Sequence, residues 1–147
     1  MLVNLTGLNN LVLVNEHLEI SDNSSLINLS GLDNLTTIEG SFNISRNNLL
    51  SEFTGLESLT TIGGELIIYS NLALINLVGL SNLNSIGDRL FIGCENDEIS
   101  ALTTLTGLYN LTTIGWDVTI LSNSSLVDLE GLNNLTSIGG SLTIDNN

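Results

Sequence analysis

A Gly-Leu pair recurs through the whole chain at a nearly constant interval. Four of the five intervals are 24 residues long, and the remaining one is 28. The pairs begin at Gly7, Gly31, Gly55, Gly79, Gly107 and Gly131. A fixed period of this length is typical of proteins that stack one supersecondary unit on the next. The period therefore predicts a linear stack in which neighbouring units share their apolar contacts.

Within each unit, the spacing of the apolar residues indicates short strands rather than a helix. In Leu142-Thr143-Ile144, apolar and polar residues alternate, which is the periodicity of a strand. The remaining apolar residues follow a spacing of three, whereas an amphipathic helix needs threes and fours and is weakened by a central Gly. We therefore predict an all-β solenoid of about six 24-residue coils, forming a single domain over residues 1–147.

An Asn recurs shortly after the alternating segment in five of the six units, and in the 28-residue unit it is displaced. Asn tolerates left-handed backbone and bonds to neighbouring backbone groups, as a repeated corner requires. Stacked Asn side chains also bond each other along an axis. We interpret this column as a structural ladder rather than a ligand site: Asn23, Asn47, Asn71, Asn123 and Asn147.

The charge of the chain excludes two classes of partner. Sixteen acidic residues stand against Arg46 and Arg89, giving a formal net charge of −14. Such a surface repels phosphate backbones and anionic lipid, so we expect no binding to nucleic acid. No apolar run is long enough to cross a bilayer, so we expect no membrane insertion.

Both ends of the chain lie within repeat sequence. Met1 is followed at once by repeat residues, and Asn147 lies partway through a unit. Solenoids usually end in atypical capping units. We therefore expect a fragment of a longer solenoid, with neighbouring repeats of the parent protein among its partners.

The string Leu-Thr-x-Ile-x-Gly-x-Leu-x-Ile-x-x-Asn-x-x-Leu-x-x-Leu is clearest over residues 59–77 and 111–129. It resembles the receptor L domain repeat, found in the ligand-binding ectodomain lobes of insulin-receptor and epidermal-growth-factor-receptor proteins. The resemblance implies a right-handed β-helix related to leucine-rich repeats. The receptor lobes are irregular and disulfide-capped, whereas this chain is regular, acidic and contains one cysteine. It is more similar to the Asn-rich tandem repeats in surface proteins of Bacteroidetes-type bacteria, which implies an extracellular or cell-surface location without receptor kinase signalling.

A horseshoe leucine-rich repeat is the competing architecture. Leu142-Thr143-Ile144 followed by Asn147 also fits the strand motif of that family. The leucine-rich repeat places a Leu two residues after the Asn, whereas here the gap is three, as from Asn71 to Leu74. No helical segment is indicated either, so we favour the β-helix.

The outward columns of the main strand are informative because core packing does not dictate them. Five of these residues fall on three adjacent coils of one face: Ile67, Tyr69, Arg89, Phe91 and Leu121. Exposed apolar groups near an Arg suggest a contact surface for a protein or a glycan. The same face could instead be covered by another domain or by an oligomer neighbour.

The one long unit carries its four extra residues in the 93–98 loop. Glu95, Asp97 and Glu98 offer oxygen ligands of the kind that calcium takes. Their spacing matches no dedicated calcium loop, so we favour a solvated insertion, with a calcium site as the alternative.

The sequence shows no catalytic constellation. Cys94 is the only cysteine, which excludes an internal disulfide, and no base lies near it in sequence. We expect it to be a buried or half-buried thiol. His17 is the only histidine and would have to serve any Ser-His-Asp triad, but no nucleophile-elbow motif accompanies it. We predict that the protein is not an enzyme and needs no cofactor.

Together these observations favour a non-enzymatic extracellular repeat module that binds a protein or a glycan. The alternative is a passive spacer or stalk. A lesser alternative is an ice-binding solenoid, suggested by hydroxyl pairs at Thr36-Thr37, Thr60-Thr61, Thr112-Thr113 and Thr136-Ser137. Adjacent strand residues point to opposite faces, so we interpret these pairs as a bend.

Overall fold

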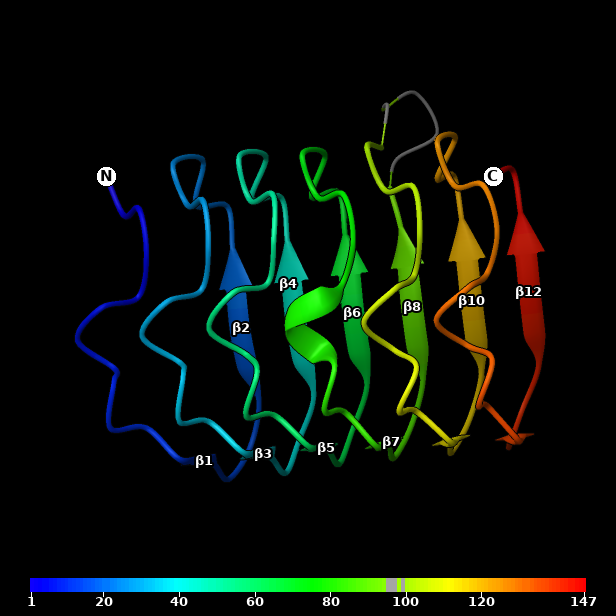
Figure 1. Cartoon of the computed structure of the whole chain (residues 1–147), viewed down its shortest axis with the longest axis horizontal. Helices are drawn as coiled ribbons and strands as arrows, with labels where there is room; N and C mark the ends of the chain where they lie inside the picture. The colour runs from blue at the N-terminus through cyan, green and yellow to red at the C-terminus, as the bar shows by residue number, and fades with distance from the viewer. Residues whose placement is uncertain (95–97, 99) are drawn as a thin grey trace.

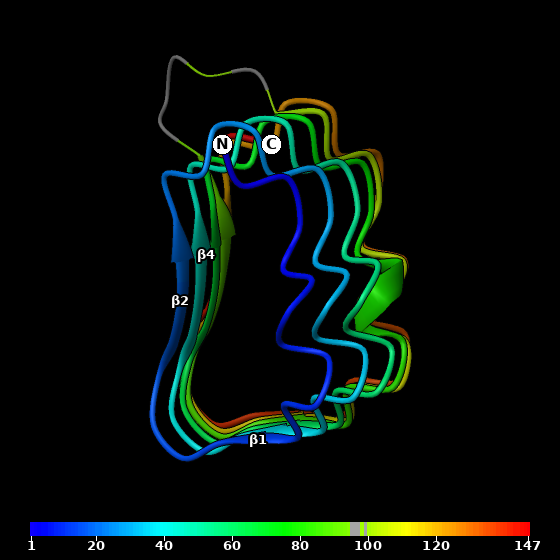
Figure 2. The ribbon, with the colours of Figure 1, turned by 90° about the vertical axis from the view of Figure 1, so that its left-hand side faces the viewer.

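The computed structural model describes residues 1–94, 98 and 100–147, which form a β-solenoid (Figure 1). Figure 2 views the solenoid from its N-terminal end. The chain runs up the left-hand wall through β2, crosses the top and runs down the right-hand wall, and each later coil lies farther from the viewer. This clockwise path makes the solenoid right-handed, as parallel strands joined by crossovers almost always are. The predicted fold class is confirmed.

One wall of the solenoid, here called the long sheet, consists of six parallel four-residue strands. Their bounds are β2 (Leu18–Ser21), β4 (Phe42–Ser45), β6 (Leu66–Tyr69), β8 (Leu90–Gly93), β10 (Val118–Leu121) and β12 (Leu142–Asp145). Five coil-to-coil pairings separate β2 from β12, so the prediction of about six coils is slightly high.

A second wall, the short sheet, contains six parallel two-residue strands. These are β1 (Leu13–Val14), β3 (Thr37–Ile38), β5 (Thr61–Ile62), β7 (Ser85–Ile86), β9 (Thr113–Ile114) and β11 (Ser137–Ile138). The second residue of each hydroxyl pair therefore lies in a strand, and the bend follows the strand, as at residues 39–40 after β3.

The third wall explains the apolar spacing of three. Here the N–H of Leu32 donates to the carbonyl of Leu29, and the N–H of Leu35 donates to the carbonyl of Leu32. Successive three-residue turns of this kind point every third side chain inward. In the middle of the solenoid one such turn is a 3-10 helix, η1 (Val78–Leu80).

The Leu and Ile columns form one continuous core. Phe42 and Phe53 are the largest fully buried side chains, and the columns around them are almost entirely buried in the inner coils. Each apolar side chain packs on its copy in the next coil. The core residues of one coil are therefore buried by the two adjacent coils and would be exposed in a coil on its own.

The Asn column links neighbouring coils through side-chain hydrogen bonds. Asn47 is fully buried, its Oδ1 accepts the N–H of Asn23 at 3.0 Å, and its Nδ2 donates to the carbonyl of Ile20 at 2.8 Å. The left-handed residue that we expected at the Asn lies one place earlier, with φ between 51° and 58°. That column is Asp22, Arg46, Ser70, Ser122 and Asn146.

Two further ladders of hydrogen bonds run along the solenoid. The first was not identified from the sequence, and the hydroxyl row of the second was interpreted there as a bend. Asn34 Nδ2 donates to the carbonyl of Asn9 at 2.7 Å, and the same bond recurs from Ser58, Asn82, Asn110 and Asn134. Thr60 Oγ1 donates to the carbonyl of Thr36 at 3.1 Å, with copies at Thr36, Thr112 and Thr136. The first hydroxyl of each Thr pair is thus engaged along the solenoid axis.

Glycine at the start of a coil allows neighbouring backbones to approach closely. Gly55 has φ of +108°, and a Cβ there would lie 2.3 Å from the carbonyl oxygen of Leu29. Gly7 has a similar φ of +125°, but no described atom lies within 4 Å of its Cβ position. A side chain at Gly7 would therefore meet backbone strain alone, whereas a side chain at Gly55 would meet the same strain and a steric clash with the neighbouring coil.

We predict that Gly55→Ala destabilises the solenoid much more than Gly7→Ala does. Both variants carry the strain of a positive φ, about 1–3 kcal/mol. Gly55→Ala also forces two coils apart, which we expect at least to double the loss. Urea unfolding followed by circular dichroism measures the difference, and equal losses would contradict the close-approach argument.

Candidate functional site

The outer face of the long sheet carries an aromatic pair where β6 and β8 lie side by side. The ring centroids of Tyr69 and Phe91 are 6.0 Å apart, and the rings are tilted by 57°. The strand register places Ile67 beside Phe91 and Tyr69 beside Gly93. Gly93 has no side chain, and Leu121 from β10 covers it, with Cγ and Cδ1 each 3.1 Å from its Cβ position. The result is a half-buried apolar surface across three coils.

Both arginines of the chain lie against these rings. The Cζ atom of Arg46 is 5.8 Å from the ring centroid of Tyr69, and that of Arg89 is 5.5 Å from the centroid of Phe91. A guanidinium over an aromatic face is attracted by the ring quadrupole. We call the set Arg46, Ile67, Tyr69, Arg89, Phe91 and Leu121 the aromatic–arginine patch.

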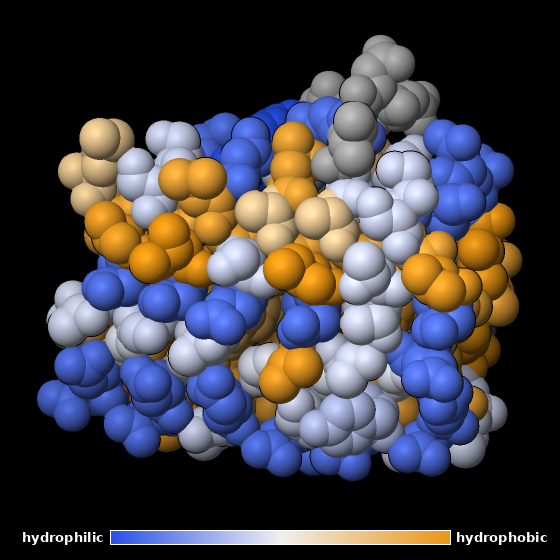
Figure 3. Space-filling view, turned by 45° about the horizontal axis from the view of Figure 1, so that its top comes forward, coloured by the Kyte–Doolittle hydropathy of each residue, from blue (hydrophilic) through white to orange (hydrophobic). Residues whose placement is uncertain are grey.

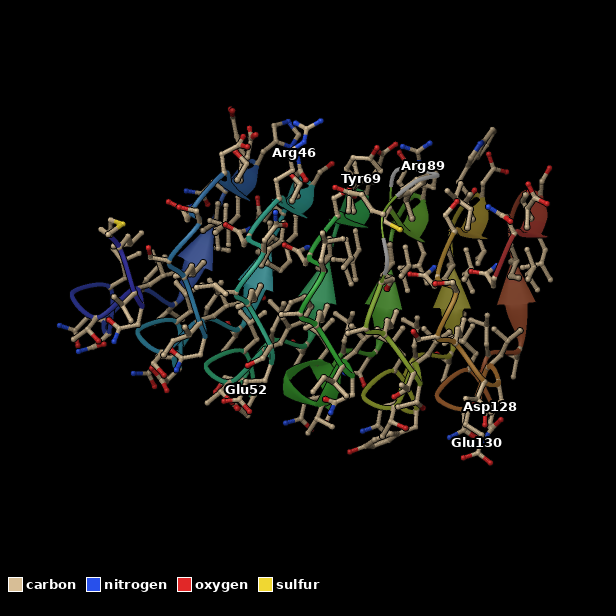
Figure 4. All side chains as sticks on the ribbon, turned by 90° about the horizontal axis from the view of Figure 1, so that it is seen from above. Arg46, Glu52, Tyr69, Arg89, Asp128 and Glu130 are labelled. Carbon is tan, nitrogen blue, oxygen red and sulfur yellow. The ribbon has the colours of Figure 1, made fainter. Side chains whose placement is uncertain are left out.

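The charge around the patch is mixed rather than purely acidic. Arg89 Nη2 lies 3.4 Å from Glu65 Oε2, and both side chains are about one-third exposed, so solvent weakens this ion pair. Figure 4 shows Arg46, Tyr69 and Arg89 along one side of the solenoid, with Glu52, Asp128 and Glu130 on the opposite side. Acidic side chains therefore lie on both sides of the solenoid, whereas both arginines lie at the patch.

The structure brings the five predicted residues together, but the sequence analysis missed Arg46. Arg46 does not belong to an outward strand column, because it follows β4 at the corner. Its left-handed backbone, with φ of 54°, directs the side chain over the next coil, where Tyr69 lies. The recurring corner position was visible in the sequence, but its backbone conformation was not.

A second surface feature was also missed: an apolar band along the upper corner of the solenoid (Figure 3). Four of its members share one column at the corner between the long sheet and the turn-forming wall and are 42–81 % exposed: Val3, Ile27, Ile75 and Val127. Ser51 and Thr103 take the other places in that column, and Leu49, which is 55 % exposed, lies two residues before Ser51. Backbone bonds keep the band in line, as from the N–H of Ile27 to the carbonyl of Val3. The sequence pattern gave no reason to separate these residues from the core.

The predicted calcium ligands fall largely outside the described residues. Glu95 and Asp97 belong to the part that the structure does not describe. Glu98 is half-buried, and its Oε2 accepts the hydroxyl of Ser70 at 2.5 Å. Among the described residues, no group of three or more His, Cys, Asp or Glu side chains is placed to hold a metal ion. Calcium at the 93–98 loop stays a prediction.

The single cysteine and the single histidine are far from catalytic geometry. Cys94 is 3 % exposed, and its Sγ donates to the carbonyl of Ser122 at 2.7 Å. Burial, with a smaller contribution from the Glu98 carboxylate, raises the pKa of the Cys94 thiol. His17 is exposed, and its Nδ1 accepts the N–H of Ser41 at 2.9 Å. His17 thus continues a side-chain-to-backbone link between coils.

Comparison with known proteins adds no family to this description. No protein-family model matches the chain, and neither a curated protein nor a solved structure matches it. The described residues contain no helix long and apolar enough to cross a membrane. The structure alone therefore establishes the β-solenoid fold. The receptor L domain type and the cell-surface location remain predictions.

We predict that Cys94 reacts slowly with iodoacetamide in the folded protein. The thiolate is the reactive form, and a raised pKa lowers its fraction at pH 8 while burial blocks access. We expect alkylation at least about tenfold slower than in urea, by mass spectrometry. Ser141→Cys in a Cys94→Ser background supplies an exposed thiol as the control. Equal rates for the two folded thiols would contradict the prediction.

Proposed function

We propose that this chain is a non-enzymatic extracellular binding module, and that the aromatic–arginine patch contacts a protein or glycan ligand at a cell surface. One observation carries the proposal. The Tyr69–Phe91 pair and both arginines gather on an outer face, where the core places no demand on residue type.

The neighbouring coils show that the apolar character of the patch is local. In the column that contains Ile67 and Phe91, the other residues are polar: Glu19, Asn43, Thr119 and Thr143. Contiguous apolar groups on a solvated sheet lower solubility unless they contact something. Tyr and Arg are also the residues that most often dominate binding energy at interfaces.

The chemistry of the patch suits a ligand with both apolar and acceptor groups. Tyr69 offers a ring and a hydroxyl, and each guanidinium offers several N–H donors in a plane. The Glu65 carboxylate lies 3.4 Å from one guanidinium, at a site that is about one-third exposed. A sugar ring with hydroxyl or carboxylate groups, or a protein loop with carboxylates, matches this set.

A passive spacer is the second candidate, and a separate observation favours it. Three side-chain ladders run along the axis and tie each coil to its neighbour, which makes the solenoid rigid. A stalk or spacer needs only a rigid solenoid and no binding surface. The spacer proposal requires no ligand at the patch, whereas the binding proposal does.

We predict that Tyr69→Ser and Phe91→Ser each weaken ligand binding at least tenfold, because an aromatic anchor at an interface contributes more than about 1.4 kcal/mol. The probes are an array of neutral and acidic oligosaccharides and a panel of purified cell-surface proteins. Thr119→Ser, in the same column as Phe91, is the matched control and should bind as the wild type does.

Circular dichroism and urea unfolding establish that the variants remain folded. If the wild type binds no member of either probe set, the spacer proposal is supported. If a ligand is found and the aromatic variants bind it normally, the contact surface lies elsewhere on the solenoid.

A further inference from the structure

Two polar atoms at the aromatic–arginine patch lack hydrogen-bond partners within the fold. Among the side chains that the structure describes, the buried oxygen and nitrogen atoms without a partner are Asn43 Oδ1 and Arg89 Nε. By contrast, the buried amide of Asn47 donates to the carbonyls of Ile20 and Ser45. A buried polar group without a partner costs free energy, so finding both such atoms at one surface requires an explanation.

Asn43 borders the patch on the side of the second coil. It lies in β4 and its register partner in β6 is Ile67, which in turn pairs with Phe91 in β8. Arg89 directly precedes β8, and its guanidinium lies over the Phe91 ring. The acceptor of Asn43 and the donor of Arg89 are therefore two coils apart, which is roughly 10 Å along the axis.

These residues belong to the inner coils of the solenoid. In the long sheet, β4, β6, β8 and β10 each have a paired strand on both sides. The exposure of the patch and the two atoms without partners are therefore properties of the middle of the stack, and they do not depend on either end of it.

The patch is a continuous series of contacts with a guanidinium at each end. Arg46 lies over Tyr69, and its Cζ is 5.8 Å from the ring centroid. The Tyr69 and Phe91 centroids are 6.0 Å apart, and Arg89 Cζ is 5.5 Å from the second ring. Arg46 follows β4 and Arg89 precedes β8, so the series runs diagonally across three coils. Figure 4 shows Arg46, Tyr69 and Arg89 in this order along one side of the solenoid.

The chemical groups of this surface define the ligand that fits it. Each guanidinium presents several N–H donors in one plane, which matches a carboxylate. The two rings between them offer apolar area on which the C–H face of a sugar ring can pack. Asn43 Oδ1 requires a donor, and a sugar hydroxyl supplies one. A carboxylated oligosaccharide carries all three kinds of group within a short length.

Both atoms without partners can come within reach of such a ligand. Asn43 is half-buried as a residue, and the Arg89 side chain is 36 % exposed. Rotamer changes of surface side chains are common when a ligand binds. A small rotation of either side chain therefore brings its polar atom to the ligand.

The size and charge of the surface favour an oligosaccharide over a folded protein. A stable protein–protein interface takes about 20–30 residues on each side, far more than this patch contains. The neighbouring residues of the same face are polar or acidic, as Glu19, Glu65 and Thr119 are. Both basic residues of a chain with a net charge of −14 lie in the patch, so its charge is complementary to a carboxylate.

We propose that the ligand of the aromatic–arginine patch is a carboxylated oligosaccharide, and that Asn43 belongs to the binding surface. This inference rests on the proposed binding function and narrows its ligand to one chemical class. The carboxylate contacts a guanidinium, the sugar rings pack on Tyr69 and Phe91, and a hydroxyl donates to Asn43 Oδ1. The ligand thus supplies partners that the fold itself does not.

Isothermal titration calorimetry with matched probes tests the ligand class. The probes are tetragalacturonate, which represents uronic acids, and sialyl-lactose, which represents sialic acids. Each is compared with its methyl ester, which keeps the rings and the hydroxyls but removes the charge. The wild type should bind at least one acid about tenfold more tightly than its ester, because charge-assisted hydrogen bonds to a guanidinium are lost on esterification.

Arg46→Gln and Arg89→Gln test which groups distinguish the acid from the ester. At least one of the two variants should bind the acid about tenfold more weakly and the ester almost unchanged, because it lacks the guanidinium that the carboxylate contacts. Glu52→Gln is the matched control, since it also changes the net charge by one unit but lies on the opposite side of the solenoid. It should bind both probes as the wild type does.

Asn43→Leu separates a ligand contact from a structural role. Leu is similar in size and removes an oxygen that has no partner in the fold, so the free energy of unfolding in urea should be equal or higher. Binding of the acid should weaken about fivefold, because the hydroxyl loses its acceptor. A variant that is less stable but binds normally would show that Asn43 is structural and would remove it from the binding surface.

The outcomes also distinguish this inference from the binding function on which it rests. If the wild type binds the esters as tightly as the acids, or binds a purified cell-surface protein and neither acid, the ligand class is wrong while the binding function stands. If it binds an acid and neither arginine variant loses the preference over the ester, the carboxylate lies elsewhere and the inference fails. If no probe of any kind binds, both proposals fail together.

Discussion

The hydrogen bonds between consecutive coils are the interaction on which the rest of the structure depends. Asn47 is fully buried, yet its amide reaches both the coil before it and its own corner. A buried amide without partners costs roughly 1–3 kcal/mol. Because the partners sit in neighbouring coils, a coil taken alone would lack both its packing and its polar contacts. The unit of folding is therefore a pair of coils or more.

The same dependence separates an invariant interior from a variable exterior. Inward columns stack apolar side chains on their copies, and the ladder columns carry side chains that can hydrogen-bond along the axis, mostly Asn, Thr and Ser. The outward columns of the long sheet carry no such requirement, so Asn43, Ile67 and Phe91 follow one another in a single column. A local surface such as the aromatic–arginine patch can exist there without disturbing the core.

The sequence predicted those parts of the fold that repeat and missed those that depend on backbone geometry. The period placed the Leu and Ile columns, and strand register then followed, so Ile67, Tyr69 and Phe91 were correctly assigned to one face. The spacing of three around Leu32 was interpreted as short strands, whereas the structure has successive three-residue turns there, the period of 3-10 geometry. Arg46 was missed for the related reason that a left-handed corner redirects its side chain.

Because both arginines lie in the patch, all the basic side chains of the molecule are gathered on one part of its surface. The chain carries sixteen acidic groups, Glu65 at the patch among them, and no basic residue other than Arg46 and Arg89, so its long-range field repels anionic partners. Guanidinium groups act at short range, and Glu65 already offsets part of the charge of Arg89. If the patch binds an anionic group as proposed, that partner would be slowed on approach and held only where its acceptors meet Arg46 and Arg89. Such an arrangement limits non-specific association more than it raises affinity, because repulsion acts everywhere except at the matching surface.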